Sequence, residues 1–272
     1  MNMAKNFEGL LLGFLEHAPL LMYYPHTRGW KFVLSWSHRI AGLLLAAYLL
    51  LHIYTLSLLS DPKQFAAMME TYSSLFFKLL EWLLAVPLIF HTLNGARLIL
   101  YESFGQRDNQ RMIRWSFILG FVYMILLGFF IVNGNQHVPA LFFWLNISIA
   151  SFIVGYFVYR KIWNTLNSVF WKLQRITGAF LLVMLPAHMV FTHLNYAVGH
   201  QAATIIPRMQ HYSYKMLDLV LIMAVLYHGA FGVYSIIEDY LKNKILRRAL
   251  TILLLLGIAY FGYIGARLTL SL

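Results

Sequence analysis

Apolar stretches long enough to cross a membrane follow one another along most of the chain. A membrane-spanning helix needs about 20 mainly apolar residues, and stretches of roughly this length lie at 33–59, 76–101, 114–132, 141–159, 173–197, 215–238 and 248–270. Another stretch, near 8–22, is shorter and carries Glu8, Glu16 and Pro19, so we expect it to lie on the membrane surface or against a partner. The pattern predicts an all-α, polytopic transmembrane helix bundle of about seven spans, in a single membrane domain over 1–272.

Four histidines lie inside these apolar stretches, in two copies of one pattern. In each copy an arginine precedes the first histidine by thirteen residues, and the second histidine stands four residues before a glycine. The pattern predicts an internal duplication, with repeats at about 33–101 and 171–242 and a helical hairpin at about 114–159 between them. The first copy holds Arg39, His52 and His91, and the second holds Arg175, His188 and His228.

The position of these histidines requires a binding partner. A histidine in the hydrocarbon region costs free energy unless its ring faces a partner or a cavity. A single one often makes a hydrogen bond to a neighbouring helix, but that alternative does not explain the repeated spacing. Four histidines on four helices can hold two metal centres with two ligands each, and a haem with two imidazole ligands is a common centre of this kind. We therefore predict a four-helix core that binds two haems b.

The depth of each histidine in the membrane predicts how the four are paired. By the helix rise, His91 and His228 lie roughly 15 Å from the inner ends of their spans, whereas His52 and His188 lie on the order of 20 Å deep. Two axial ligands of one iron must lie at nearly the same depth. We therefore expect His91 and His228 to bind an inner haem, and His52 and His188 to bind an outer haem.

Charge and composition restrict the location and the chemistry of the chain. The chain is 60% hydrophobic and only 11% charged, which is typical of an integral membrane protein. Of its 21 lysines and arginines, sixteen lie in segments on one side of the predicted bundle, so the positive-inside rule places the N-terminus inside. The net charge of +11 therefore requires no nucleic acid partner. The absence of cysteine excludes disulfides and any iron–sulfur cluster held by this chain.

Three sequence motifs resemble those of known membrane-anchor subunits. Residues 35–42 resemble the Ser-x-x-His-Arg-x-x-Gly motif of the larger anchor subunit of succinate dehydrogenase, and residues 91–97 are similar to its His-x-x-x-Gly-x-Arg haem-ligand motif. His228, followed by Asp239 and Tyr240, resembles the smaller anchor subunit. The whole chain looks like a fused anchor with two haems b, as in the single-subunit cytochrome b of some succinate:menaquinone and quinol:fumarate reductases.

This resemblance implies a function, partners and further site residues. It implies a membrane lipid environment, in a prokaryotic cytoplasmic membrane, with a flavoprotein and an iron–sulfur subunit docked on the inner face. An arginine side chain, with its fixed guanidinium group, can hydrogen-bond a haem propionate or a quinone carbonyl better than a lysine side chain can. Two-haem anchors commonly have five spans, which is an alternative to seven. By position the inner quinone site comprises Ser35, Arg39, Asp239 and Tyr240, and the haem-binding set also includes His38, Arg97 and Arg175.

Three functions are compatible with these features. In the first, the chain passes electrons between an iron–sulfur subunit and membrane quinone, as part of a succinate:quinone oxidoreductase or quinol:fumarate reductase, and carries out no dicarboxylate chemistry itself. In the second, it is the cytochrome b subunit of a hydrogenase or formate dehydrogenase. In the third, it is a haem-free transporter whose buried histidines relay protons. The serine–histidine–arginine and aspartate–tyrosine motifs favour the first hypothesis.

Overall fold

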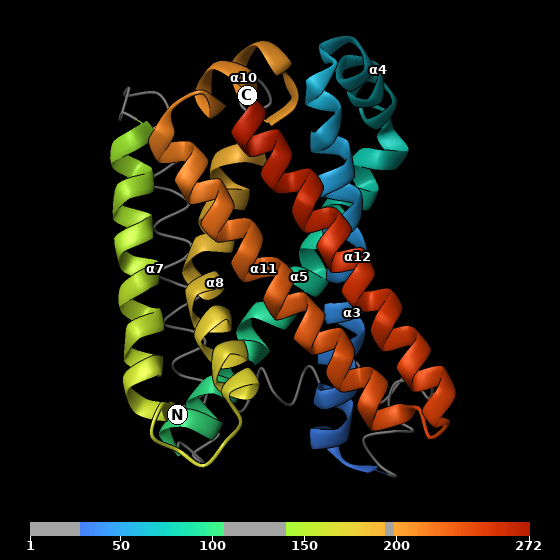
Figure 1. Ribbon diagram of the computed structural model, residues 1–272, viewed down its shortest axis with the longest axis vertical. Helices are drawn as coiled ribbons and strands as arrows, with labels where there is room; N and C mark the ends of the chain where they lie inside the picture. Colours follow the sequence, from blue (N-terminus) through green and yellow to red (C-terminus); the bar gives the residue numbers. More distant parts are fainter. Residues whose placement is uncertain (1–27, 106–139, 194–198) are drawn as a thin grey trace, which may run out of the picture.

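The computed structural model describes residues 28–105, 140–193 and 199–272, and within these ranges the regular structure is entirely helical. The predicted all-α fold is confirmed (Figure 1). The long helices are α3 (Trp30–Ser57), α5 (Leu75–Phe104), α7 (Ala140–Ile162), α8 (Val169–His193), α11 (Tyr212–Tyr240) and α12 (Lys244–Ser271). Between them lie a short 3-10 turn, η1 (Leu58–Ser60), and two short helices, α4 (Pro62–Tyr72) and α10 (Ala202–Met209).

Six of the described helices are long and apolar enough to span a membrane. They correspond to six of the seven predicted spans, and they exceed the five of the alternative. The predicted span at 114–132 and the surface segment at 8–22 lie outside the described residues. Large apolar side chains on the outside of the bundle, such as Leu253 and Leu256 of α12, are more than half exposed. Such a surface fits lipid, and the chain is an integral membrane protein.

Four helices form a closed ring at the centre of the molecule. Helix α3 packs against α5 and α11, and α8 packs against the same two helices from the other side. These are the four helices that carry the paired histidines. Helix α7 covers α8 and α5, while α12 covers α11 and α3, so the two additional helices lie at the left and right edges of Figure 1. Because two of these helices come from each repeat, both repeats contribute residues to one shared core.

The two ends of the bundle differ in character. At one end, which we call the basic end, α3, α8 and α12 begin and α5, α7 and α11 finish; it corresponds to the predicted inner side. At the opposite end α4 and α10 pack together (Figure 1). Asp61 is the N-cap of helix α4, and its side chain accepts hydrogen bonds from the backbone of Lys63 and Gln64. An apolar cluster joins these short helices to the bundle, and its buried members are Leu59, Phe65, Met69, Ile205, Met209 and Leu268.

Candidate functional site

The four predicted ligand histidines lie in two pairs inside the ring of helices. His91 of α5 and His228 of α11 have ring centroids 6.2 Å apart, with ring planes at 88°. His52 of α3 and His188 of α8 have centroids 6.3 Å apart, with planes at 89°. Each pair joins one histidine from each repeat. The structure thus brings together the residues that helix depth had paired, and two different helix pairs reach the same geometry.

The spacing of each pair fits two imidazoles bound to opposite sides of one metal ion. A metal–imidazole bond is about 2.0–2.1 Å long and the nitrogen lies ~1.1 Å from the ring centre, so the two centroids of such a pair lie about 6.3 Å apart. The observed separations of 6.2 and 6.3 Å match this value. Perpendicular ring planes are compatible with it, because each ring can rotate about the metal–nitrogen axis. The donor sets therefore fit a metal with two axial histidines.

The His91 ring is held by the backbone of α3. Its Nδ1 lies 3.1 Å from the carbonyl oxygen of His38, which can accept a hydrogen bond only if Nδ1 carries the proton. That tautomer leaves Nε2 unprotonated, as a metal ligand must be. On the same helix, a Cβ built at Gly42 would lie 3.1 Å from His91 Cε1. Any larger residue at position 42 would therefore require the imidazole to shift by a few tenths of an ångström.

A glycine also leaves room for the histidine of the second repeat. A Cβ at Gly178 of α8 would lie 3.0 Å from Cε1 of His228. The glycine of each repeated motif thus receives the second histidine of its own repeat: Gly42 receives His91, and Gly178 receives His228. The sequence shows the spacing of these residues, but only the packing of α3 on α5 and of α8 on α11 explains why glycine occurs there.

Buried polar atoms without partners surround the His91–His228 pair. The His38 ring stacks on His91 with centroids 3.9 Å apart and planes at 4°, and its Nδ1 has no hydrogen-bond partner among the described residues. The amide Nδ2 of Asn94 is likewise buried and without a partner within those ranges, while Asn94 Oδ1 accepts a hydrogen bond of 2.8 Å from Arg97 Nε. Unsatisfied buried polar groups are costly, so His38, Asn94 and Arg97 fit a further polar or anionic group at this level.

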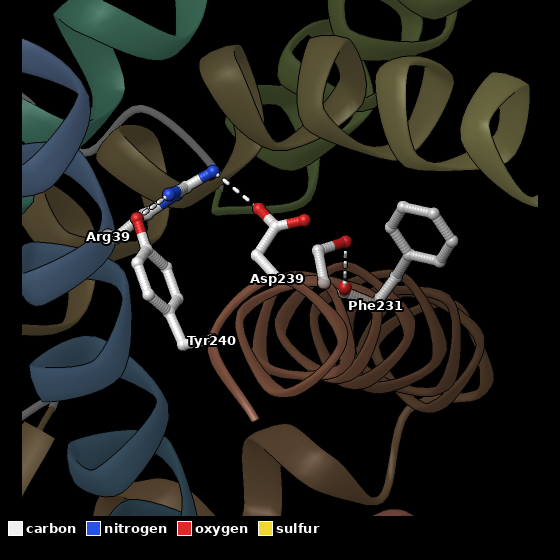
Figure 2. Close-up of polar contacts among 5 residues, drawn as sticks. Arg39, Phe231, Asp239 and Tyr240 are labelled. Carbon is white, nitrogen blue, oxygen red and sulfur yellow. Dashed lines mark hydrogen bonds and ion pairs between the residues drawn. The ribbon is translucent and has the colours of Figure 1, made fainter. Parts of the chain in front are cut away.

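The four predicted quinone-site residues lie at the basic end, where α3 meets the end of α11. Arg39 Nη2 lies 2.6 Å from Asp239 Oδ2, and Arg39 Nη1 donates to the hydroxyl of Tyr240 (Figure 2). The guanidinium carbon lies 5.1 Å from the centroid of the Tyr240 ring, and Trp36 packs on the same ring at 4.9 Å. Ser35 is exposed and lies one helical turn before Arg39, on the same side of α3.

A second ion pair at this end involves a residue that sequence reasoning missed. Arg175, predicted to belong to the haem-binding set, contacts Glu102 of α5 through both Nε (2.6 Å) and Nη2 (2.5 Å). Its guanidinium carbon lies 4.8 Å from the Trp171 ring centroid. The signal that predicts Glu102 is the duplication itself, because Glu102 follows His91 by eleven residues, as Asp239 follows His228.

Aromatic side chains lie beside the His52–His188 pair. Tyr48, one turn before His52 on α3, stacks near its ring at 5.7 Å. Trp144 of α7 lies 6.2 Å from the His188 ring, and it belongs to a buried apolar cluster that joins α7, α8 and α11. Trp144 stands in none of the repeated motifs, so its place beside this pair was not predictable from them.

Comparison with known proteins identifies the family. The model of the succinate dehydrogenase/fumarate reductase transmembrane subunit family matches residues 20–131 and 157–264. Succinate dehydrogenase 2 membrane subunit SdhC of Mycobacterium tuberculosis is 32% identical over 111 residues, which is 40% of this chain and 78% of that protein. No solved structure gives a significant match.

Two further relatives carry the same description. The succinate dehydrogenase hydrophobic membrane anchor subunit of Coxiella burnetii is 31% identical over 96 residues, which is 34% of this chain and 78% of that protein. The corresponding subunit of Archaeoglobus fulgidus is 28% identical over 102 residues, 36% of this chain and 87% of that protein. The family match covers most of the chain in two segments, and these segments contain the motifs of both repeats. The chain therefore belongs to the family of succinate dehydrogenase/fumarate reductase transmembrane subunits.

Proposed function

We propose that this chain is the two-haem membrane anchor of a succinate:quinone oxidoreductase or quinol:fumarate reductase, and that it passes electrons between an iron–sulfur subunit and membrane quinone. The observation that carries the proposal is the presence of two histidine pairs with 6.2 and 6.3 Å spacing inside one ring of helices. The family match favours this function over a hydrogenase or formate dehydrogenase cytochrome b and over a haem-free transporter.

The histidine pairs would hold the two haems. His91 and His228 would hold one haem b, and His52 and His188 the other; each haem, when bound, supplies a one-electron redox centre. The His38 carbonyl fixes the ring orientation and tautomer of His91. His38 and Arg97 would bind the propionates of the haem at the basic end, where buried polar atoms lack partners among the described residues.

The quinone would bind at the basic end, between α3 and α11. Arg39 donates to the oxygen of the Tyr240 hydroxyl, so the hydroxyl hydrogen of Tyr240 is directed elsewhere and can donate to a quinone carbonyl. Asp239 holds the Arg39 guanidinium through a 2.6 Å contact and thus orients it. Ser35, on the adjacent turn, adds a second hydroxyl. Reduction of the quinone to quinol takes up two electrons and two protons, and the Tyr240 hydroxyl would deliver one of these protons.

The remaining parts of the enzyme would be separate subunits. Because the chain has no cysteine, iron–sulfur clusters must be held by a partner, and the flavoprotein that handles the dicarboxylate would bind that partner. With the N-terminus inside, both would dock at the basic end, beside Arg39. The relatives are about half as long as this chain, and the family matches twice, so one copy of this chain would serve as the complete anchor.

The test is the haem content of the purified chain. Pyridine haemochrome analysis should return close to two haems b per polypeptide, with an absorption band near 400–430 nm. A single haem would limit the ligand set to one histidine pair. The absence of haem from a folded, fully assembled preparation would overturn the proposal and favour the histidine-relay transporter.

A further inference from the structure

Trp144 lies beside the His52–His188 pair, on a helix that carries none of the four predicted ligands. Its helix, α7, packs along α8 (Figure 1), and its ring centroid is 6.2 Å from that of His188. Trp144 is the fifth residue of α7 from the end opposite to the basic end, and His188 is the sixth residue of α8 from that same end. By the helix rise, the indole therefore lies at nearly the same depth as this histidine pair.

Aromatic rings hold the indole in place. The rings of Phe143 and Phe191 both lie with their centroids 5.1 Å from that of Trp144, and Phe191 stands one turn after His188 on α8. Trp144 is only 6% exposed and belongs to the buried cluster that joins α7, α8 and α11. A tryptophan of the interfacial belt keeps its N–H group at the lipid headgroups, so that role does not explain this residue.

The indole N–H group is buried, and the described part of the chain offers it no partner. Trp144 Nε1 has no hydrogen bond to any residue within the described ranges. A buried donor without a partner costs free energy, and phenylalanine, which carries no such group, would avoid this cost at the same position. Because an indole N–H can only donate, the missing partner is a hydrogen-bond acceptor.

The proposed haem between His52 and His188 supplies such an acceptor. The edge of haem b carries methyl groups, vinyl groups and two propionates, and of these only the propionate carboxylates accept strong hydrogen bonds. A carboxylate within the membrane in turn needs donors. We propose that Trp144 donates a hydrogen bond from Nε1 to a propionate of this haem and so positions it. The proposal rests on the proposed function, and it extends that function to a residue outside both segments matched by the family model.

This hydrogen bond would raise the reduction potential of the haem. A propionate charge favours ferric over ferrous iron, because ferric iron carries one more positive charge. A donor to the propionate offsets part of its charge and thereby weakens this preference. The haem at the basic end would receive its donors from His38 and Arg97 instead, so the two haems would be tuned by different helices.

Redox titration of the purified complex, with the full chain in place, tests this proposal. Trp144→Phe keeps an aromatic ring and removes the N–H donor. It should lower the midpoint potential of the haem whose signal His188→Ala removes. The expected shift is a roughly threefold change in the reduction equilibrium, or ~28 mV for one electron, because only part of the hydrogen-bond energy depends on the charge of the iron. The potential of the other haem and the content of both haems should not change.

Phe143→Leu is the matched control, because it removes a ring from the same cluster but no hydrogen-bond donor. It should leave both potentials unchanged. Equal shifts in the two variants would assign Trp144 a packing role only, and no shift in either variant would mean that Nε1 has another acceptor; both outcomes overturn the proposal. A parent complex that contains no haem would overturn the proposed function itself, and the proposal with it.

A measurement on the parent complex keeps the proposal testable if Trp144→Phe does not assemble. Infrared difference spectra between the reduced and oxidised states of the same haem should contain an indole N–H band, which isotopic labelling of the tryptophan nitrogen identifies. The band should appear because the strength of the hydrogen bond follows the charge of the haem. A spectrum in which no tryptophan band responds to that haem would overturn the proposal.

Discussion

At the scale of single residues, the histidine rings depend on glycines that leave them room. A side chain at Gly42 would meet His91 Cε1 at 3.1 Å from its first carbon. We expect Gly42→Leu to displace the ring and to remove the low-spin signal of the haem that His91 and His228 bind, while the signal of the other haem remains. Gly257→Leu on α12 is the matched control, because a Cβ there meets no atom within 4 Å. Optical or electron paramagnetic resonance spectra of the purified variants make the comparison, and equal haem loss in both would contradict the packing argument.

A second prediction at this scale concerns the quinone site. Arg39 contacts both Tyr240 and Asp239 at the basic end, and none of the three is a predicted haem ligand. Removal of a hydrogen bond to a charged group typically costs about 1.5–3 kcal/mol, so Arg39→Ala and Tyr240→Phe should each slow quinone reduction roughly tenfold or more. The haem content should stay near that of the parent chain.

Two assays on the same preparation separate these effects. Electron transfer to a soluble quinone analogue reports on the site itself, and succinate oxidation with an artificial acceptor reports on the partner subunits. A selective loss of the first activity is expected. Equal loss of both, or loss of neither, would mean that the pocket between α3 and α11 is assigned to the wrong residues.

At the scale of helices, the pairing of ligands follows from the ring of α3, α5, α8 and α11. His91 and His228 face each other across α5 and α11, and His52 and His188 across α3 and α8. Replacement of His52 or His188 by alanine should therefore remove one spectral component, and replacement of His91 or His228 should remove the other. Should His52 and His91 instead share one component, each repeat would bind its own haem and the depth argument would fail.

The helices also show which features the sequence could predict. Helix rise converts spacing into depth, so the sequence predicts which histidines lie at the same depth, and the ring spacing in the structure agrees for His52 with His188 and for His91 with His228. The interval alone could not predict the contact of Glu102 with Arg175, because it depends on how α5 packs against α8. Helices α4 and α10 were not predicted, since each is short and only partly apolar. Their contact with each other depends on how the long helices that carry them are packed.

At the scale of the whole molecule, the sequence pattern predicted two repeats with a helical hairpin inserted between them. The two segments matched by the family model divide the chain differently. The first match, 20–131, contains three predicted spans, and the second, 157–264, contains most of another three. Helix α7 then lies mainly between the two matched segments. Three spans leave the chain on the far side of the membrane, so one additional span returns it to the near side. With α7 in that role, both repeats begin on the same side and their histidines reach matching depths.

This division predicts that the chain can be cut without loss of the haems. The connection between α7 and α8 is exposed, with Leu166 at 106% of its reference exposure, so a break between Thr165 and Leu166 disturbs little packing. Each haem of the proposed function would take one ligand from each side of this break, and α8 packs against both α7 and α5 across it. Co-expressed segments 1–165 and 166–272 should therefore co-purify, with close to two haems per pair.

The same experiment with each segment expressed alone is the more demanding one. Segment 1–165 retains His52 and His91, which lie at different depths on their helices, and segment 166–272 retains His188 and His228, which are separated in the same way. Neither segment, as a monomer, can place two imidazoles on opposite sides of one iron, so neither should show the low-spin haem spectrum. A single segment that purifies as a monomer with such a spectrum would mean that the ligands pair within a repeat. If both segments bind haem only when mixed, the core exists only where the two repeats meet, and the fusion of the repeats fixes their one-to-one ratio.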